Sequence, residues 1–150
     1  MKRMPGTALA AMLLIVAGAA QAAETHEVRM LNRNETGAMP FEPDFLRIAP
    51  GDTIKFLATH PSHNAASMPE IIPEGAEQFR GKINEEIEVT FTVDGTYGIK
   101  CLPHYSMGMV MLIIVGDEPI ESFTIPDELP AGAKKRFEEI VARAKANATQ

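Results

Sequence analysis

Four side chains of this sequence have the types and spacing to bind one metal ion. Three lie in a short segment, in which Cys101 is followed by His104 and then by Met109. A loop of this length can fold back so that the thiolate, the imidazole and the thioether converge on one point. A second imidazole is available from His63, 38 residues before the cysteine. These four residues are the candidate metal ligands.

The ligand types favour copper over zinc. Thiolate and thioether sulfur favour Cu(I), and imidazole binds both Cu(I) and Cu(II). Two histidines, one cysteine and a weak axial methionine are typical of a blue-copper electron-transfer site. Zinc also accepts two histidines and a cysteine, but a catalytic zinc keeps a water in the fourth position rather than a thioether. We therefore expect one copper ion that alternates between Cu(I) and Cu(II).

Two of the ligands have a rival close by in the sequence. His60 lies three residues before His63, and Met107 lies two residues before Met109. Spacing alone leaves both choices open.

A cysteine with nearby histidines also suggests a nucleophile, with Cys101 activated by His104 or His63. However, no recognisable oxyanion loop or acidic orienting residue adjoins the cysteine, and Leu102-Pro103 is unsuited to an open nucleophile turn. We expect a protein that is not an enzyme.

The elements that must position these residues are predicted to be short strands. Residues 87–93 alternate between apolar and polar side chains, which is the period of a half-buried strand. Further strands are predicted at residues 27–31, 45–48, 53–58, 96–100 and 110–115. Strands at this spacing indicate a β-sandwich. Residues 60–84 show no clear period and are expected to form a long loop with room for one helical turn.

The C-terminal part has a different pattern. In residues 131–146, Phe137, Ile140, Val141 and Ala144 recur at helical spacing, and charged residues occupy the other faces. This pattern predicts an amphipathic helix that covers part of the sandwich.

The N-terminus indicates export. Lys2 and Arg3 precede an apolar run at residues 8–20, and Ala20-Gln21-Ala22 is a small-residue cleavage site. This order predicts a secretory signal peptide of residues 1–22, with a retained membrane anchor as the alternative. Its removal would change the net charge from −6 to −8, which argues against nucleic-acid binding. The single cysteine excludes an intramolecular disulfide. A free exposed thiol is a liability in an oxidising compartment, so after export this thiol is expected to be buried, bonded or metal-bound.

Several motifs together resemble one family. The sequence is similar to the cupredoxins, the small blue copper proteins, and most closely to the pseudoazurins. The motifs are Met30-Leu31-Asn32, Gly37-Ala38-Met39, Phe41-Glu42-Pro43, His63-Asn64, the run Ile-Pro-Glu-Gly-Ala-Glu at 72–77, Pro103-His104-Tyr105 and Met107-Gly108-Met109. The resemblance covers residues 24–116 and a helical tail.

The resemblance implies a mainly β fold and a complete site. The fold would be an eight-stranded Greek-key cupredoxin sandwich in residues 23–116, with a C-terminal helical extension in residues 117–150. The implied copper ligands are His63, Cys101, His104 and Met109, in preference to His60 and Met107. Around them, Asn64 would tie the cysteine strand to the ligand loop, and Met39 and Pro103 would lie beside His104.

The resemblance also implies a function. The protein would be a periplasmic, monomeric one-electron carrier, with a cytochrome or other donor and an acidic acceptor such as copper nitrite reductase. It would have no membrane span after cleavage. A copper storage or delivery protein of the same fold is the alternative. Arg33, Arg80, Lys82 and Lys100 occupy positions where pseudoazurins tend to place basic residues, and they are expected to form the docking surface.

The sequence departs from the family pattern at three places. Leu102 stands where a threonine is common, and Pro61 stands where a lysine is frequent. The tail carries Pro119, Pro126 and Pro130, so the first of two expected tail helices is predicted to be short or absent.

Overall fold

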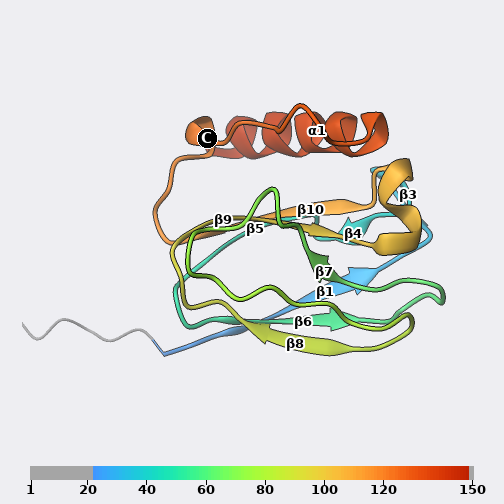
Figure 1. Ribbon diagram of the computed structural model, residues 1–150, viewed down its shortest axis with the longest axis horizontal. Coiled ribbons are helices and arrows are strands. Elements are labelled where there is room, and N and C mark those ends of the chain that lie inside the picture. The colour runs from blue at the N-terminus through green and yellow to red at the C-terminus, as the bar shows by residue number, and fades with distance from the viewer. Residues whose placement is uncertain (1–21, 149–150) are drawn as a thin grey trace, which may run out of the picture.

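Two four-stranded β-sheets, a two-stranded ribbon and one long helix are the main elements of the described part of the chain, residues 22–148 of the computed structural model (Figure 1). Apart from Ala22, the predicted signal peptide lies outside these residues. The first four-stranded sheet has the order β4 (Phe41–Glu42), β1 (Thr25–Met30), β6 (Thr53–Leu57) and β8 (Ile87–Thr90). The second has the order β5 (Phe45–Ile48), β10 (Val110–Val115), β9 (Gly95–Lys100) and β7 (Ala66–Ser67). A separate ribbon pairs β2 (Arg33–Asn34) with β3 (Gly37–Ala38).

The strands predicted from apolar patterns are all present, with ends shifted by a few residues. In the first sheet, β1 runs parallel to β6, so that Val28 lies opposite Phe56, and β6 is antiparallel to β8. In the second sheet, β10 is parallel to β5 and antiparallel to β9. The long segment 60–84 contains β7 and no helical turn.

Strand β10 is buried on both faces, which explains its unbroken apolar sequence. Met111, Ile113 and Val115 belong to the core between the two sheets. The alternate residues Val110, Leu112 and Ile114 belong to a second core, between this sheet and the C-terminal helix. One strand therefore joins the sandwich to the helix.

Helix α1 (Ala131–Ala148) confirms the predicted amphipathic helix. It lies across the outer face of the second sheet and buries Phe137, Ile140 and Ala144 against β10 (Figure 1). Between β10 and α1 the only helical segment is the short 3₁₀ helix η2 (Ile120–Ser122), as the prolines of this segment predicted. None of the helices described here is both long enough and apolar enough to cross a membrane.

Candidate metal centre

The ligand loop connects β9 to β10 and is closed by backbone hydrogen bonds. Cys101 directly follows β9 and precedes the 3₁₀ helix η1 (Leu102–Met107). The Cys101 N–H donates to the Met109 carbonyl (3.0 Å), and the Met109 N–H donates to the His104 carbonyl (3.1 Å). Gly108 ends η1 with a φ of +92°, in the left-handed region that glycine adopts easily. The turn therefore brings the cysteine and methionine backbones together.

Three predicted ligands converge in space. The ligand atoms of His63, Cys101 and His104 all lie within 4.8 Å of one another. Cys101 Sγ is 3.7 Å from His63 Nδ1 and 3.5 Å from His104 Nδ1. The two Nδ1 atoms are 3.1 Å apart. Both imidazoles thus point the same nitrogen at the thiol, as ligands of one small cation would.

Burial separates the two candidate methionines. Met109 is fully buried, in the same core cluster as Cys101. Met107 lies at the end of η1, and 54% of its surface is exposed. A thioether that shares the cysteine's buried surroundings suits an axial ligand, so the structure favours Met109.

His60 has a different partner from His63. Its Nδ1 accepts a hydrogen bond from the Asn32 N–H (2.9 Å), and it is not part of the cluster formed by His63, Cys101 and His104. The structure therefore favours His63, the choice that the family motif implied.

Two asparagines hold the ligands in place. Asn64 is buried, and its Oδ1 accepts from the Leu102 N–H (2.8 Å) while its Nδ2 donates to the Gly81 carbonyl (2.9 Å). It ties the segment that carries His63 to the start of the ligand loop, directly after Cys101. This bond uses the backbone N–H of residue 102, so it does not depend on which side chain stands there.

Asn32 is the second asparagine, and sequence reasoning did not assign it a role. Its Oδ1 lies 2.8 Å from His63 Nε2 and accepts that nitrogen's proton. This bond fixes the tautomer in which His63 Nδ1 keeps its lone pair for a metal. The only sequence signal was the family motif Met30-Leu31-Asn32.

Met39 and Pro103 are the remaining two residues predicted to support the site. Met39 is half-buried against the sandwich core, has a φ of +52°, and donates its N–H to the Asn32 carbonyl (2.8 Å). Pro103 is exposed in the first turn of η1, next to His104.

Burial in the ligand pocket favours the neutral forms of Cys101 and His63. Burial raises the pKa of the Cys101 thiol above its ordinary value. The pKa of His63 is lowered to about 4, mainly by burial and then by the nearby His104 and His60. A bound cation would favour the thiolate and keep the histidine neutral, so metal binding would release the thiol proton. The donor set of thiol, two imidazoles and a nearby thioether fits copper.

Three of the four predicted docking residues lie together. Arg80 and Lys82 line one surface hollow with Leu102, the residue after the cysteine. Arg80 and Lys100 line a second hollow, again with Leu102. Lys100 Nζ also lies 4.8 Å from the centroid of the Tyr105 ring. Arg33 is exposed in β2 and lines neither hollow.

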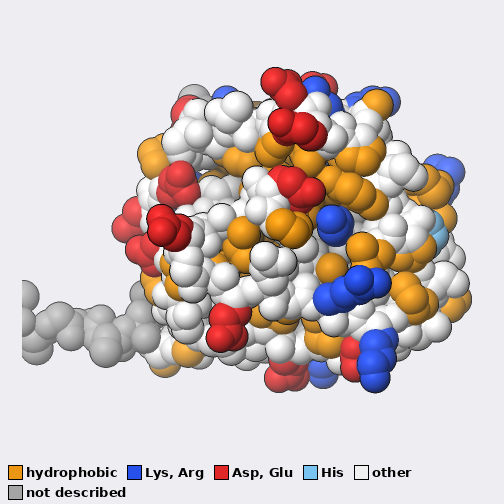
Figure 2. Space-filling view, viewed as in Figure 1, with side chains coloured by type: hydrophobic (Ala, Val, Ile, Leu, Met, Phe, Trp, Pro, Cys, Tyr) orange, Lys and Arg blue, Asp and Glu red, His pale blue; other side chains and the backbone are white. Residues whose placement is uncertain are grey.

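The charges are unevenly distributed over the face in Figure 2. Blue Lys and Arg side chains gather on its right half, the half that holds the ligand loop in Figure 1. Red Asp and Glu side chains predominate on the left half.

Comparison with known proteins agrees with the fold and the site. Residues 28–116 match the copper-binding proteins of the plastocyanin/azurin family. A pseudoazurin from Paracoccus pantotrophus is 54% identical over 112 residues, which are 75% of this chain and 77% of the relative. A putative pseudoazurin from Rhizobium leguminosarum bv. viciae is 44% identical over 92% of this chain and 91% of its own length.

Solved structures give the same result. The crystal structure of pseudoazurin from Methylobacterium extorquens AM1 superposes with a TM-score of 0.71 at 37% identity, covering 80% of this chain and 98% of that one. The chain therefore belongs to the plastocyanin/azurin family of copper-binding proteins and, within it, to the pseudoazurins. The predicted mainly β fold with a C-terminal helix and the copper cofactor are confirmed. The family consists of electron carriers rather than enzymes, which excludes a cysteine nucleophile.

Proposed function

We propose that this protein is a periplasmic one-electron carrier that passes electrons to an acidic redox enzyme such as copper nitrite reductase. The proposed ligands of its type 1 copper are His63, Cys101, His104 and Met109. The observation that carries the proposal is the convergence of thiol and imidazole atoms within 4.8 Å at one end of the sandwich. When bound, copper supplies the one-electron Cu(II)/Cu(I) couple.

The protein's own contribution is a site that is held before the metal arrives. The bonds across the ligand loop and those of Asn32 and Asn64 join three separate segments of chain. Ligands held in this way move little between the two oxidation states, and a small rearrangement favours fast electron transfer. A rigid, buried site also exchanges metal slowly, which argues against copper storage or delivery.

The structure also suggests where electrons enter and leave. His63, Cys101 and Met109 are buried, whereas the His104 side chain is partly exposed. The exposed residues Pro61, Pro103 and Met107 lie in the segments that carry the two histidines. An imidazole edge with apolar neighbours is a suitable contact for the redox centre of a partner.

The basic residues Arg80, Lys82 and Lys100 support an acidic partner. They gather around Leu102, beside the site, although the whole chain carries a net charge of −6. Complementary charge of this kind mainly accelerates encounter. Export to the periplasm is supported by the predicted signal peptide at residues 1–22 and by the kinship with pseudoazurins.

The first test is spectroscopic. Copper-loaded protein should show an intense visible thiolate-to-Cu(II) absorption and the EPR spectrum of a type 1 site. Cys101→Ser should abolish that absorption because the band requires the thiolate. The Ser106→Ala variant, altered on the same loop at an exposed residue, should stay blue. Colourless copper-loaded wild type, or a blue Cys101→Ser variant, would contradict the proposal.

The second test concerns transfer. Reduced protein should be oxidised rapidly by a copper nitrite reductase in stopped-flow mixing and should keep its copper when challenged with a chelator. Rapid loss of copper to the chelator, without electron transfer, would favour storage or delivery instead.

A further inference from the structure

We infer that helix α1 braces the copper centre and that Gly132 and Arg136, in its first two turns, are positioning residues for the ligands. This inference rests on the proposed copper function and adds a part of the chain outside the matched residues 28–116. The first turns of α1 contact the ligand loop through Gly132 and the segment next to Asn32 and Met39 through Arg136.

The Gly132 contact is with the ligand loop. A Cβ atom on Gly132 would lie 2.3 Å from the Ser106 carbonyl oxygen, and one on Gly108 would lie 2.6 Å from the Gly132 carbonyl oxygen. The two backbones therefore touch directly, at distances that no side chain allows. The part of the loop between His104 and Met109 rests on the start of the helix.

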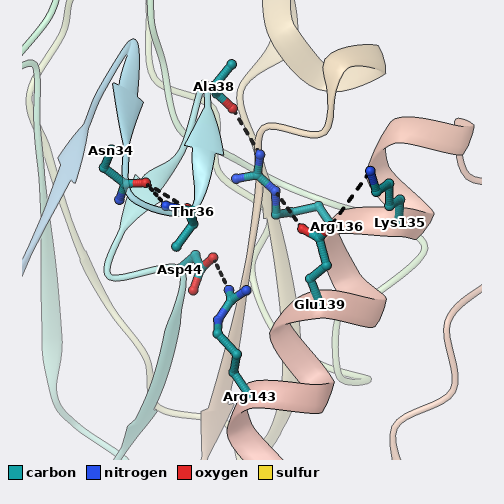
Figure 3. A network of polar contacts seen from close by, with 8 residues as sticks. All are labelled: Asn34, Thr36, Ala38, Asp44, Lys135, Arg136, Glu139 and Arg143. Carbon is teal, nitrogen blue, oxygen red and sulfur yellow. Dashed lines mark hydrogen bonds and ion pairs between the residues drawn. The ribbon is translucent and has the colours of Figure 1, made fainter.

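The Arg136 contact is with the segment that orients the other histidine. Arg136 Nη2 donates to the Ala38 carbonyl at 2.9 Å, and Figure 3 shows the guanidinium reaching from α1 to this atom. The next residue, Met39, donates its N–H to Asn32, whose side chain accepts the His63 proton. Helix, Ala38–Met39, Asn32 and His63 thus form one continuous chain of bonds.

The burial and the incomplete hydrogen bonding of Arg136 indicate a role other than stabilising the fold. Only 7% of Arg136 is exposed, and its Nη1 atom has no hydrogen-bond partner among the described residues. Its Nε atom is 3.7 Å from the Glu139 carboxylate, a long ion pair. A buried charge that is incompletely paired contributes little to stability, and an apolar side chain of similar size often serves the fold as well. What an apolar side chain cannot supply is the directional bond to Ala38.

Arg143 provides a matched control on the same helix. Arg143 Nη2 binds the Asp44 carboxylate at 2.5 Å, two turns further along the helix (Figure 3). Arg143→Met should lower the unfolding temperature and leave the copper spectra unchanged. Arg136→Met should shift the EPR parameters and the reduction potential and should leave the unfolding temperature nearly unchanged. Arg136→Lys, which restores a donor, should recover part of the shift.

A second, independent test uses one variant that replaces a glycine of α1 and one control variant that introduces a glycine. Gly132→Ala raises intrinsic helix propensity, so a purely local effect would stabilise the protein. The brace instead predicts a displaced ligand loop, with altered absorption and EPR spectra and a several-fold slower electron self-exchange. Ala142→Gly, at an exposed position of α1, should weaken the helix and leave the spectra unchanged.

The outcomes separate the inference from the function it rests on. All measurements use the copper-loaded protein from which residues 1–22 have been removed. Wild type that is blue, with unchanged spectra and potential in Arg136→Met and Gly132→Ala, would overturn the brace and leave the proposed function intact. Equal shifts in Arg136→Met and Arg143→Met would also overturn it. Wild type that is not blue would overturn the function itself.

If Gly132→Ala does not fold, the spectra of Arg136→Met decide, because this substitution adds no atoms to the contact between α1 and the ligand loop.

Discussion

Met109 and Met107 lie on the same loop, but only Met109 shares the buried surroundings of the cysteine. Met109→Gln should therefore keep copper and lower the reduction potential, because an amide oxygen is a harder ligand that favours Cu(II). Cyclic voltammetry measures the shift. Met107→Gln is the matched control, and its potential should stay close to that of wild type. A larger shift of the reduction potential in Met107→Gln than in Met109→Gln would identify Met107 as the axial ligand instead.

The residues that support the ligands show where sequence reasoning stops. Cys101, His104 and Met109 are close in sequence, so their convergence follows from loop length. The bond from His63 to Asn32 joins residues 31 positions apart, and its partner could be recognised only through a family motif. Arg136 bonds Ala38 across 98 positions, so no local pattern indicates it.

At the scale of elements, Asp52 ties the start of β1 to the turn before β6. Its Oδ1 accepts from the Glu24 N–H (2.8 Å), and its Oδ2 accepts from the Ala49 N–H (3.0 Å) and lies 3.0 Å from His26 Nε2. The Glu24 N–H bond, followed by the bond to His26, lowers the pKa of this buried carboxyl below its ordinary 3.8. The sequence indicated only a turn at this position.

Asp52→Asn should lower the unfolding free energy at neutral pH by about 2 kcal/mol, because the amide satisfies fewer of these donors. The folded protein binds the Asp52 proton less tightly than the unfolded chain does. The stabilisation is therefore complete above pH 3.8 and is lost as the pH falls through the lower folded value. Denaturant unfolding at several pH values measures this change.

Exposed Asp117 provides the comparison. Asp117→Asn should leave the unfolding free energy within about 0.5 kcal/mol of wild type. An Asp52→Asn protein as stable as Asp117→Asn at neutral pH would contradict the role of this tether.

The elements that could be predicted are those whose own residues show a pattern, either alternation between apolar and polar side chains or an unbroken apolar run. Strand β8 alternates, and β10 is apolar throughout because a sheet covers one face and α1 the other. The two-residue strands β2, β3, β4 and β7 carry no period at all. Strand β7 exists because Ala66 and Ser67 pair with the end of β9, and such tertiary pairing leaves no local signal.

At the scale of the whole molecule, the basic side chains beside the site should govern encounter with an acidic reductase. Lys82→Glu or Lys100→Glu should slow electron transfer to it several-fold at low salt, and the difference should shrink as ionic strength rises. Stopped-flow rates over a salt series measure both effects. Lys82 is the cleaner site, because Lys100 also contacts the Tyr105 ring.

Lys145→Glu is the control for these reversals, because Lys145 lies near the end of α1, far along the helix from the ligand loop. Its rate and salt dependence should follow those of wild type. Equal effects at Lys145 and Lys82 would show that net charge, rather than a local surface, sets the rate.

The face in Figure 2 carries basic side chains toward the copper end and acidic ones toward the other end, while the whole chain is an anion. The field of an acidic partner repels the net negative charge of this chain and exerts a torque that turns the copper end forward. Salt screens the repulsion, the torque and the attraction beyond about 8 Å, so all three act over the last approach. We expect such a carrier to reach an acidic partner with its copper end forward and to be held weakly. It can leave soon after the electron has crossed, so one molecule can serve many encounters in succession.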